Sequence, residues 1–245
     1  MRDKPNHFCI PDTQCRKGVP LDHCRWIGEY IVDRRPDVIV HLGDHWDMPS
    51  LSSYDKGKLS FEGRRYVHDV KAGHDGMQRL IKPWHSIKDY NPRRVMLRGN
   101  HEWRPVRFAD EFPEMSEKVS LDDLDVKQYG FEDHPFLKPV EIDGIEYCHY
   151  FTSGVMGRPA SSAAVILRER QRSATQGHVQ YTDIAMHKKT QQIALMAGTF
   201  YSHDEDYLGY QGNSQKRHIV VKHEVEEGRY DLMFVSLRFL EKAYS

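Results

Sequence analysis

The sequence has few cysteines, no long apolar run and almost no net charge, and each shortage excludes a class of protein. Its four cysteines, Cys9, Cys15, Cys24 and Cys148, include no C-x-x-C pair and no dense framework, which indicates free thiols in a reducing compartment. No apolar stretch approaches the roughly 18 residues of a membrane span, and residues 1–11 lack the apolar core of a signal peptide. We therefore expect a cytoplasmic protein that has no membrane partner.

The charged residues are almost balanced, with 35 Lys and Arg against 36 Asp and Glu and a formal net charge of −1. This balance excludes a generally basic nucleic-acid coat and an acidic tail, but it leaves room for a local basic groove. A 39% hydrophobic fraction over 245 residues is enough for a real core, and no Ser/Gly/Pro-rich linker divides the chain. We therefore expect one domain over residues 1–245. Histidine is unusually frequent, with 15 residues, and it is the commonest metal ligand.

Hydrophobic periodicity and turn residues predict alternating strands and helices, followed by hairpins. In the first half we expect strands at Asn6–Ile10, Asp37–Leu42 and Arg94–Leu97, a helix at Leu21–Arg35, and a helical stretch from about Glu62 to Tyr90 that breaks near Gly73–Gly76 and at Pro83. In the second half we expect hairpins at Lys138–Ile142 with Ile145–Phe151 and at His218–Glu224 with Tyr230–Leu237, a helix at Pro159–Arg172 and a strand at Gln191–Phe200. The pattern indicates an α/β fold with a mixed sheet or two packed sheets, and helices outside.

Polar side chains follow the predicted strands at the points where the strands end. Asp12 and Gln14 follow the first strand, Asp44 the second, and Asn100 with His101 the third. Ligands of open α/β sheets bind outside the carboxyl ends of the strands, so these groups should meet at one edge. Further on, His149 ends a hairpin strand and His178 follows a glycine, with Gln180 two residues later. Oxygen and imidazole groups that converge from several loops suit a divalent metal.

In this order the motifs resemble those of the calcineurin-like metallophosphoesterase family. The matching residues are Asp12-Thr13-Gln14, Gly43-Asp44, Gly99-Asn100-His101-Glu102, His149 and Gly177-His178-Val179-Gln180. The resemblance runs from about Phe8 to Phe200, and the RGNHE stretch at Arg98–Glu102 is its most specific part. It implies an αββα sandwich of two mixed sheets flanked by helices, with two divalent ions between the sheet edges.

The resemblance also implies a role for each residue of the motifs. Asp44 would bridge the two ions. Asn100, His149 and His178 would complete one metal site, which we call the second site. Asp12, Gln14 and Gln180 would form the other, which we call the first site. His101 would stand near the scissile phosphate as a general acid or phosphate-stabilising group, while the ions hold the attacking water and polarise the phosphoryl oxygens.

Two glutamines depart from the family pattern, which has histidine at both places. In the family these two positions serve the same metal, so the resemblance implies a first site rich in oxygen donors and a second site that keeps two imidazoles. Hard oxygen donors suit Mg²⁺, Mn²⁺ or Ca²⁺, and imidazole suits Zn²⁺, Fe or Ni²⁺. Mn²⁺ tolerates both environments, and we therefore favour two Mn²⁺ ions over Mg²⁺, Ni²⁺, Fe or Zn²⁺. The alternative is that both glutamines are surface amides and that the first site is lost.

Four further residues are candidates for supporting roles. Arg104, three residues after His101, is either a catalytic group that holds a substrate phosphate or an ordinary solvated arginine at a helix start. Glu102 is expected to orient a metal ligand or His101. Arg16 and His203 are candidates for lining the cleft.

Among phosphoesterases, we favour a phosphodiesterase or nuclease that acts on DNA, RNA or nucleotides. The compact size and the DTQ opening are similar to those of small, often phage-encoded members of the family, which places such a protein in the host cytoplasm. A phosphomonoesterase is the nearest alternative, because the same metal pair performs both reactions. A non-catalytic binding protein on a decayed scaffold is the alternative from another class. The sequence does not indicate an oligomeric state.

Overall fold

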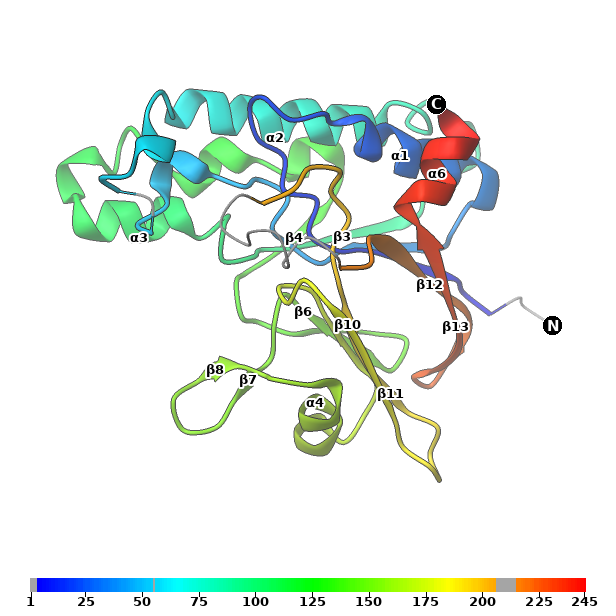
Figure 1. Cartoon of the computed structure of the whole chain (residues 1–245). Coiled ribbons are helices and arrows are strands. Elements are labelled where there is room, and N and C mark those ends of the chain that lie inside the picture. The colour runs from blue at the N-terminus through cyan, green and yellow to red at the C-terminus, as the bar shows by residue number, and fades with distance from the viewer. Residues whose placement is uncertain (1–3, 55, 206–214) are drawn as a thin grey trace.

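The computed structural model describes residues 4–54, 56–205 and 215–245. Two β-sheets pack against each other, and helices cover the outer side of each (Figure 1). The first sheet has the order β13-β12-β1-β2-β3-β4, formed by Arg229–Ser236, His218–Glu226, His7–Ile10, Val38–His41, Arg93–Leu97 and Glu132–His134. The second has the order β10-β11-β9-β6-β5, formed by Thr182–Met186, Ile193–Ala197, Ala174–Gln176, Ile145–Cys148 and Val140–Ile142. A small hairpin pairs β7 (Thr152–Ser153) with β8 (Arg158–Pro159).

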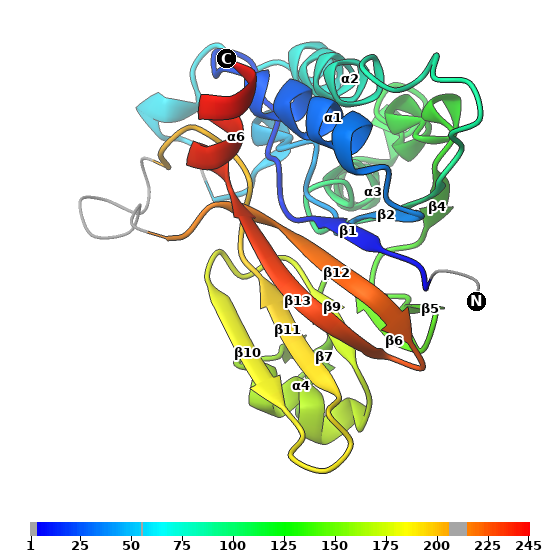
Figure 2. The ribbon, with the colours of Figure 1, turned by 90° about the vertical axis from the view of Figure 1, so that its right-hand side faces the viewer.

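The helices form the two outer layers, as the side view shows most clearly (Figure 2). Beside the first sheet lie α1 (Asp22–Arg34), α2 (Tyr66–Ile81), α3 (Arg104–Glu111) and α6 (Leu237–Tyr244), and beside the second lies α4 (Ala163–Arg170). Short 3-10 turns occupy Pro49–Leu51, Leu59–Phe61, Pro113–Met115, Leu121–Leu124 and Lys127–Tyr129. Within the described residues, no helix is both long and apolar enough to cross a membrane.

Three hydrophobic clusters hold the four layers together. Along β1, Phe8 and Ile10 belong to the cluster beneath α1 and α2, whereas Cys9 belongs to the cluster between the sheets. Along β11, Leu195 faces the cluster between the sheets and Met196 faces the cluster under α4. This alternation is the two-residue period of a strand that is buried on both faces. The expected fold class, an α/β sandwich of two mixed sheets flanked by helices, is confirmed.

Parallel pairing carries the predicted site residues to one edge of the first sheet. β1 pairs in parallel with β2, and β2 in parallel with β3, so the three strands end side by side. In the second sheet β9 lies parallel to both β6 and β11. The loops after β6 and β9, which carry His149 and His178, therefore also leave the second sheet at a shared edge.

Two sequence predictions about helices are wrong. The expected break at Gly73–Gly76 is absent, and α2 runs without interruption from Tyr66 to Ile81. These glycines allow close packing: a Cβ on Gly73 would overlap the Trp46 ring, and one on Gly76 would lie 2.5 Å from the Cys15 sulfur. The helix expected from Pro159 begins only at Ala163, because Ser162 caps it by accepting a hydrogen bond from Val165 N–H.

Candidate metal centre

The loops that follow β1 and β2 are joined at the point where they carry their acidic residues. The Gln14 N–H donates to the Asp44 carbonyl oxygen at 3.0 Å, and both residues have positive φ values, 40° and 51°. Asp12, Gln14 and Asp44 are all buried, with at most 3% of their surface exposed. Buried carboxylates and amides need hydrogen-bond donors or cations as partners.

The residues expected in the second metal site lie together. A carboxylate oxygen of Asp44 and ring nitrogens of His149 and His178 all lie within 4.8 Å of one another. The Asp44 Oδ2 to His149 Nε2 distance is 3.4 Å, and the Asn100 Oδ1 to His149 Nε2 distance is 2.9 Å. Four side chains from four loops thus surround one small volume.

The orientation of His149 favours a positive charge at its inner nitrogen. Its Nδ1 lies 2.8 Å from the Leu42 carbonyl oxygen, so Nδ1–H donates outward and Nε2 points at the oxygens of Asp44 and Asn100. Although burial lowers the pKa of His149, the Asp44 carboxylate raises it to about 9. Either a proton or a metal ion at Nε2 would place positive charge there, and a backbone carbonyl on the other nitrogen is the usual arrangement of a metal-binding histidine.

His178 and Asp44 show how strongly the groups of this centre influence one another. Burial and the neighbouring His149 lower the pKa of His178 to about 4, which leaves its imidazole neutral and able to bind a metal. Burial alone would raise the pKa of Asp44, but His101 and His149 hold it far below the usual range. The centre therefore offers an ionised carboxylate beside a neutral imidazole.

Glycines permit the close approach of these loops. A Cβ on Gly99 would collide with the Asp44 carboxylate, and one on Gly177 would lie 2.7 Å from Asp12 Oδ1. Gly43 has φ +100° and lies against the His149 ring. At these three places a larger residue would push the ligand groups apart.

The residues expected in the first site include two buried oxygen atoms without a hydrogen-bond donor among the described residues. They are Asp12 Oδ2 and Gln14 Oε1. The other carboxylate oxygen of Asp12 accepts the His178 N–H at 3.1 Å. Burial, with a further contribution from Asp44, raises the pKa of Asp12 to about 7. Gln180 is half-buried two residues after His178. Since a divalent cation would neutralise the paired carboxylates and coordinate both oxygens, the donor set fits a hard metal ion.

Glu102 connects the loops that carry the candidate metal ligands Asp44 and Asn100. Its fully buried carboxylate accepts hydrogen bonds from four backbone N–H groups, those of Asp44, His45, Trp46 and Gly99, at 2.6–2.9 Å. One side chain thereby fixes the loop after β2 to the loop after β3. Glu102 was expected to orient a metal ligand or His101, and in the structure its carboxylate contacts the backbone N–H of Asp44.

His101 lies beside the centre and is held by two neighbours. Its Nδ1 is 3.0 Å from Asp47 Oδ1, its Nε2 is 3.0 Å from Arg104 Nη2, and its Nε2 is 3.8 Å from Asp44 Oδ2. Burial and Arg104 lower the pKa of His101, but the carboxylates of Asp44 and Asp47 outweigh them, so the pKa is raised. The ring therefore lies at the edge of the metal centre, with one nitrogen toward Asp47 and the other toward Asp44 and Arg104.

Arg104 is held in place by hydrogen bonds and is not an ordinary solvated arginine. Its guanidinium also donates to the carbonyl oxygens of Asp47 and Met48 at 2.7 and 3.1 Å. It begins α3 and orients His101. Asp47 was missed by the sequence analysis. Its only signal is its position three residues after Asp44, on the same loop.

Arg16 and His203 belong to a chain of charged groups that leads away from His101. Arg16 Nη1 lies 3.1 Å from Asp47 Oδ2 and 3.0 Å from Glu205 Oε2. His203 Nε2 lies 2.9 Å from Glu205 Oε1. Both residues thus reach the site indirectly, through Asp47.

Three half-buried aromatic residues line one side of the metal centre. The Tyr150 ring lies 4.6 Å from the His178 ring, Phe136 lies 5.6 Å from Tyr150, and Trp103 lies 5.9 Å from Phe136, measured between centroids. We call Trp103, Phe136 and Tyr150 the aromatic wall. Exposed aromatic faces can stack on flat ring systems.

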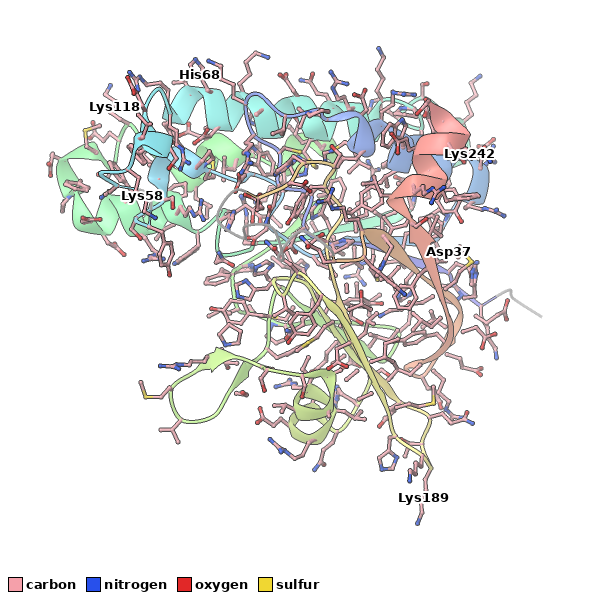
Figure 3. The ribbon with its side chains drawn as sticks, viewed as in Figure 1. Asp37, Lys58, His68, Lys118, Lys189 and Lys242 are labelled. Carbon is pink, nitrogen blue, oxygen red and sulfur yellow. The ribbon has the colours of Figure 1, made fainter. Side chains whose placement is uncertain are left out.

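The basic residues are spread over distant parts of the surface. Lys58 and Lys118 lie at the same end of the molecule as α3, whereas Lys189 lies at the tip of the β10–β11 hairpin (Figure 3). On and after α4, Arg170 and Arg172 pair with glutamates on the second sheet. The labelled lysines therefore do not form one continuous basic surface.

Comparison with known proteins gives partial matches. No family model matches this chain. The Gene 54 proteins of Mycobacterium phages L5 and D29 are 34% and 31% identical to it over 115 and 106 residues, which are 45% and 42% of this chain. The matches span 42% and 38% of these relatives, less than half of their lengths.

Among solved structures, a conserved uncharacterized protein of Streptococcus pneumoniae TIGR4, described as a predicted phosphoesterase, is 12% identical with a TM-score of 0.36. The match covers 96% of this chain and 100% of that one. A second solved structure is 11% identical with a TM-score of 0.44. The match covers 95% of this chain and 100% of that one.

Proposed function

We propose that this chain is a divalent-metal-dependent phosphoesterase with a binuclear metal centre. The observation that carries the proposal is the position of Asp44. Its Oδ2 lies 3.4 Å from His149 Nε2, its charge raises the pKa of Asp12, and its backbone carbonyl accepts from Gln14 N–H. Asp44 thus interacts with members of both proposed ligand sets, which supports a bridging role for its carboxylate.

The residues of the chain have distinct parts in the proposed reaction. Asp12, Gln14, Asp44 and Gln180 would hold one ion, and Asp44, Asn100, His149 and His178 the other. Ions held there would act as Lewis acids on the phosphoryl group and the attacking water. His101 would donate a proton to the leaving oxygen or stabilise the phosphate, with Asp47 and Arg104 fixing its ring. Glu102 would hold the loop after β2 and the loop after β3 in place relative to each other.

The aromatic wall supports a diester of a nucleic acid or nucleotide as the substrate. Tyr150 contacts the His178 ring directly, so a base next to a phosphate in the centre would lie within reach of an aromatic face. Stacking on aromatic side chains tolerates any base, which suits a nuclease without sequence preference. Phosphomonoesterase activity remains the alternative, since the same ions serve both reactions.

The test is an activity panel on the chain after EDTA treatment and reconstitution with Mn²⁺, Mg²⁺, Zn²⁺, Ni²⁺ or Ca²⁺. The substrates are bis-p-nitrophenyl phosphate, p-nitrophenyl phosphate, and single- and double-stranded DNA and RNA. We expect Mn²⁺-dependent cleavage of the diesters, loss of activity in Asp44→Asn and full activity in His187→Ala, an exposed control. Cleavage of the monoester alone would favour the phosphatase. No cleavage, with one or no Mn²⁺ ion bound per chain in a calorimetric titration, would indicate a decayed scaffold.

A further inference from the structure

A second group of metal-ligand side chains lies behind the candidate metal centre. The sulfurs of Cys15 and Cys24 are 3.6 Å apart, and both lie within 4.8 Å of a ring nitrogen of His23. All three side chains are buried, with at most 1% of their surface exposed. Cys15 belongs to the loop after β1, whereas His23 and Cys24 belong to the first turn of α1.

One ring nitrogen of His23 is available to bind an ion. Its Nε2 lies 3.0 Å from the Thr13 carbonyl oxygen, to which it donates. Its Nδ1 is buried and has no hydrogen-bond partner among the described residues. A buried ring nitrogen without a partner is costly, and it is explained if Nδ1 is the nitrogen that binds an ion.

His45, on the loop after β2, lies outside this group of three but reaches Cys15. Its Nε2 lies 2.9 Å from the Gly73 carbonyl oxygen, and its Nδ1 lies 3.9 Å from the Cys15 sulfur. The Nδ1 also lies 2.7 Å from Thr13 Oγ1, whose hydroxyl can rotate to another acceptor. Metal-binding histidines usually donate their second N–H to a backbone carbonyl, as both histidines do here.

We propose that Cys15, His23, Cys24 and His45 form a structural Zn²⁺ site of the Cys₂His₂ type. Two thiolates on one tetrahedral Zn²⁺, at about 2.3 Å each, lie roughly 3.8 Å apart, close to the observed 3.6 Å and far from the ~2.05 Å of a disulfide. Thiolate and imidazole ligands select Zn²⁺ over Mg²⁺ or Mn²⁺. Four protein ligands and complete burial describe a closed site, in contrast to the candidate catalytic centre.

The location of this thiolate site indicates which segments an ion there would hold together. It would tie α1 to the loop that carries Gln14 and to the loop that carries Asp44. On its other side α2 approaches closely at Gly76, where a Cβ would lie 2.5 Å from the Cys15 sulfur. The Zn²⁺ ion would thus stabilise the loops that carry Gln14 and Asp44, the candidate ligands of the catalytic metals. It would not take part in the chemistry of those metals.

The experiment is incorporation of Co²⁺ in place of Zn²⁺ in the full chain. Cobalt bound by thiolates has a near-ultraviolet charge-transfer band and strong visible bands that oxygen ligands do not produce. We expect these bands at one Co²⁺ per chain in the wild type, in Cys9→Ser, and in Asp12→Asn, which removes a ligand of the other centre. We expect Cys24→Ser to lose them. Retention in Asp12→Asn separates this site from the proposed phosphoesterase centre, so either proposal can fail alone.

A second measurement decides the question if Cys24→Ser does not fold. In the zinc-loaded, EDTA-washed wild type, titration with a mercurial reagent should release one Zn²⁺ per chain as the thiols react. Absence of both the thiolate bands and the released zinc in the wild type would overturn the proposal. A mass two hydrogens lower under non-reducing conditions, with a Cys15–Cys24 disulfide in the peptide map, would overturn it as well.

Discussion

The Nδ1 nitrogen of His101 lies 3.0 Å from the Oδ1 oxygen of Asp47, while its Nε2 lies 3.8 Å from Asp44 Oδ2. The Asp47 carboxylate thus orients the ring, and the Asp44 carboxylate belongs to the candidate metal centre. His101→Ala should reduce turnover by about 10²- to 10⁴-fold, as is usual for a positioned acid or base. The measurement is kcat with bis-p-nitrophenyl phosphate, together with the number of Mn²⁺ ions bound.

The number of Mn²⁺ ions bound by His101→Ala shows whether His101 acts as a general acid or as a metal ligand. We expect the Mn²⁺ stoichiometry of His101→Ala to equal that of the wild type, and we expect His187→Ala to retain full turnover. Loss of an Mn²⁺ ion in His101→Ala would show that the ring is a metal ligand and that its assigned role is wrong.

The convergence of the site residues could be predicted because it follows from strand topology. Short β-branched runs that end in Gly-Asp or Gly-Asn indicate buried parallel strands, and parallel neighbours end at one edge. Asp12, Asp44 and Asn100 therefore come together whatever the details of the loops. The strand and hairpin pattern allowed either one mixed sheet or two packed sheets, and the family resemblance favoured two.

Other parts of the structure depend on contacts between distant segments, which periodicity does not report. Asp47 lies farther along the loop after β2 than Asp44, and its position depends on contacts with Arg104 and with Cys15, which are distant in the sequence. Gly73 and Gly76 suggested a helix break, but they serve the contact of α2 with the loops beneath it. β9 has three residues, too few to show alternation, and it forms because β6 and β11 flank it.

Glu102→Gln should destabilise the fold and weaken metal binding together. The amide NH₂ would replace one oxygen that now accepts two backbone N–H groups, and each buried donor left without a partner costs about 1–3 kcal/mol. We expect the free energy of unfolding to fall by roughly 2–6 kcal/mol in urea titrations. Glu114→Gln, on an exposed residue, should be neutral. Unchanged stability of Glu102→Gln would mean that the carboxylate does not hold these loops.

The aromatic wall should matter only for substrates that carry bases. Tyr150→Leu should weaken binding of a DNA oligonucleotide by about 5- to 150-fold, since stacking of one base is worth about 1–3 kcal/mol. Tyr150→Phe should keep the wild-type KM, and an oligonucleotide that is abasic around the scissile phosphate should bind both variants equally. If Tyr150→Leu weakens the abasic substrate as much as the normal one, the residue supports the metal centre and does not contact bases.

Buried Lys222 should make stability depend on pH in the alkaline range. Its amine donates to Thr175 and Tyr147 at 2.6 and 3.2 Å, and burial lowers its pKa from 10.5 to about 8, against a smaller opposite effect of Cys9. The folded protein releases this proton before the unfolded chain does. The lysine therefore costs most below pH 8, and the unfolding free energy should rise by roughly 3 kcal/mol between pH 8 and 10.5.

The matched comparison for that rise is Lys222→Met, which keeps the length of the side chain but cannot titrate. Cysteine and tyrosine residues ionise over the same range, but they are common to both proteins, so the difference between the two pH profiles isolates the lysine. Parallel profiles would show that Lys222 keeps an ordinary pKa in the fold.

The two glutamines should set the affinity and the metal preference of the first site. Gln14 Oε1 is buried without a donor among the described residues, as expected of an oxygen that faces a cation. A neutral amide oxygen donates less strongly than imidazole to late transition metals. The first site should therefore bind its ion only at higher metal concentrations than the second site, and it should lack a preference for Zn²⁺. Gln14→His/Gln180→His should tighten this site and shift its preference toward Zn²⁺, Ni²⁺ or Fe. The measurement is metal occupancy and rate against free metal concentration for both proteins. Identical affinity and metal ranking would remove the glutamines from the ligand set, and activity would then have to come from a centre that holds one ion.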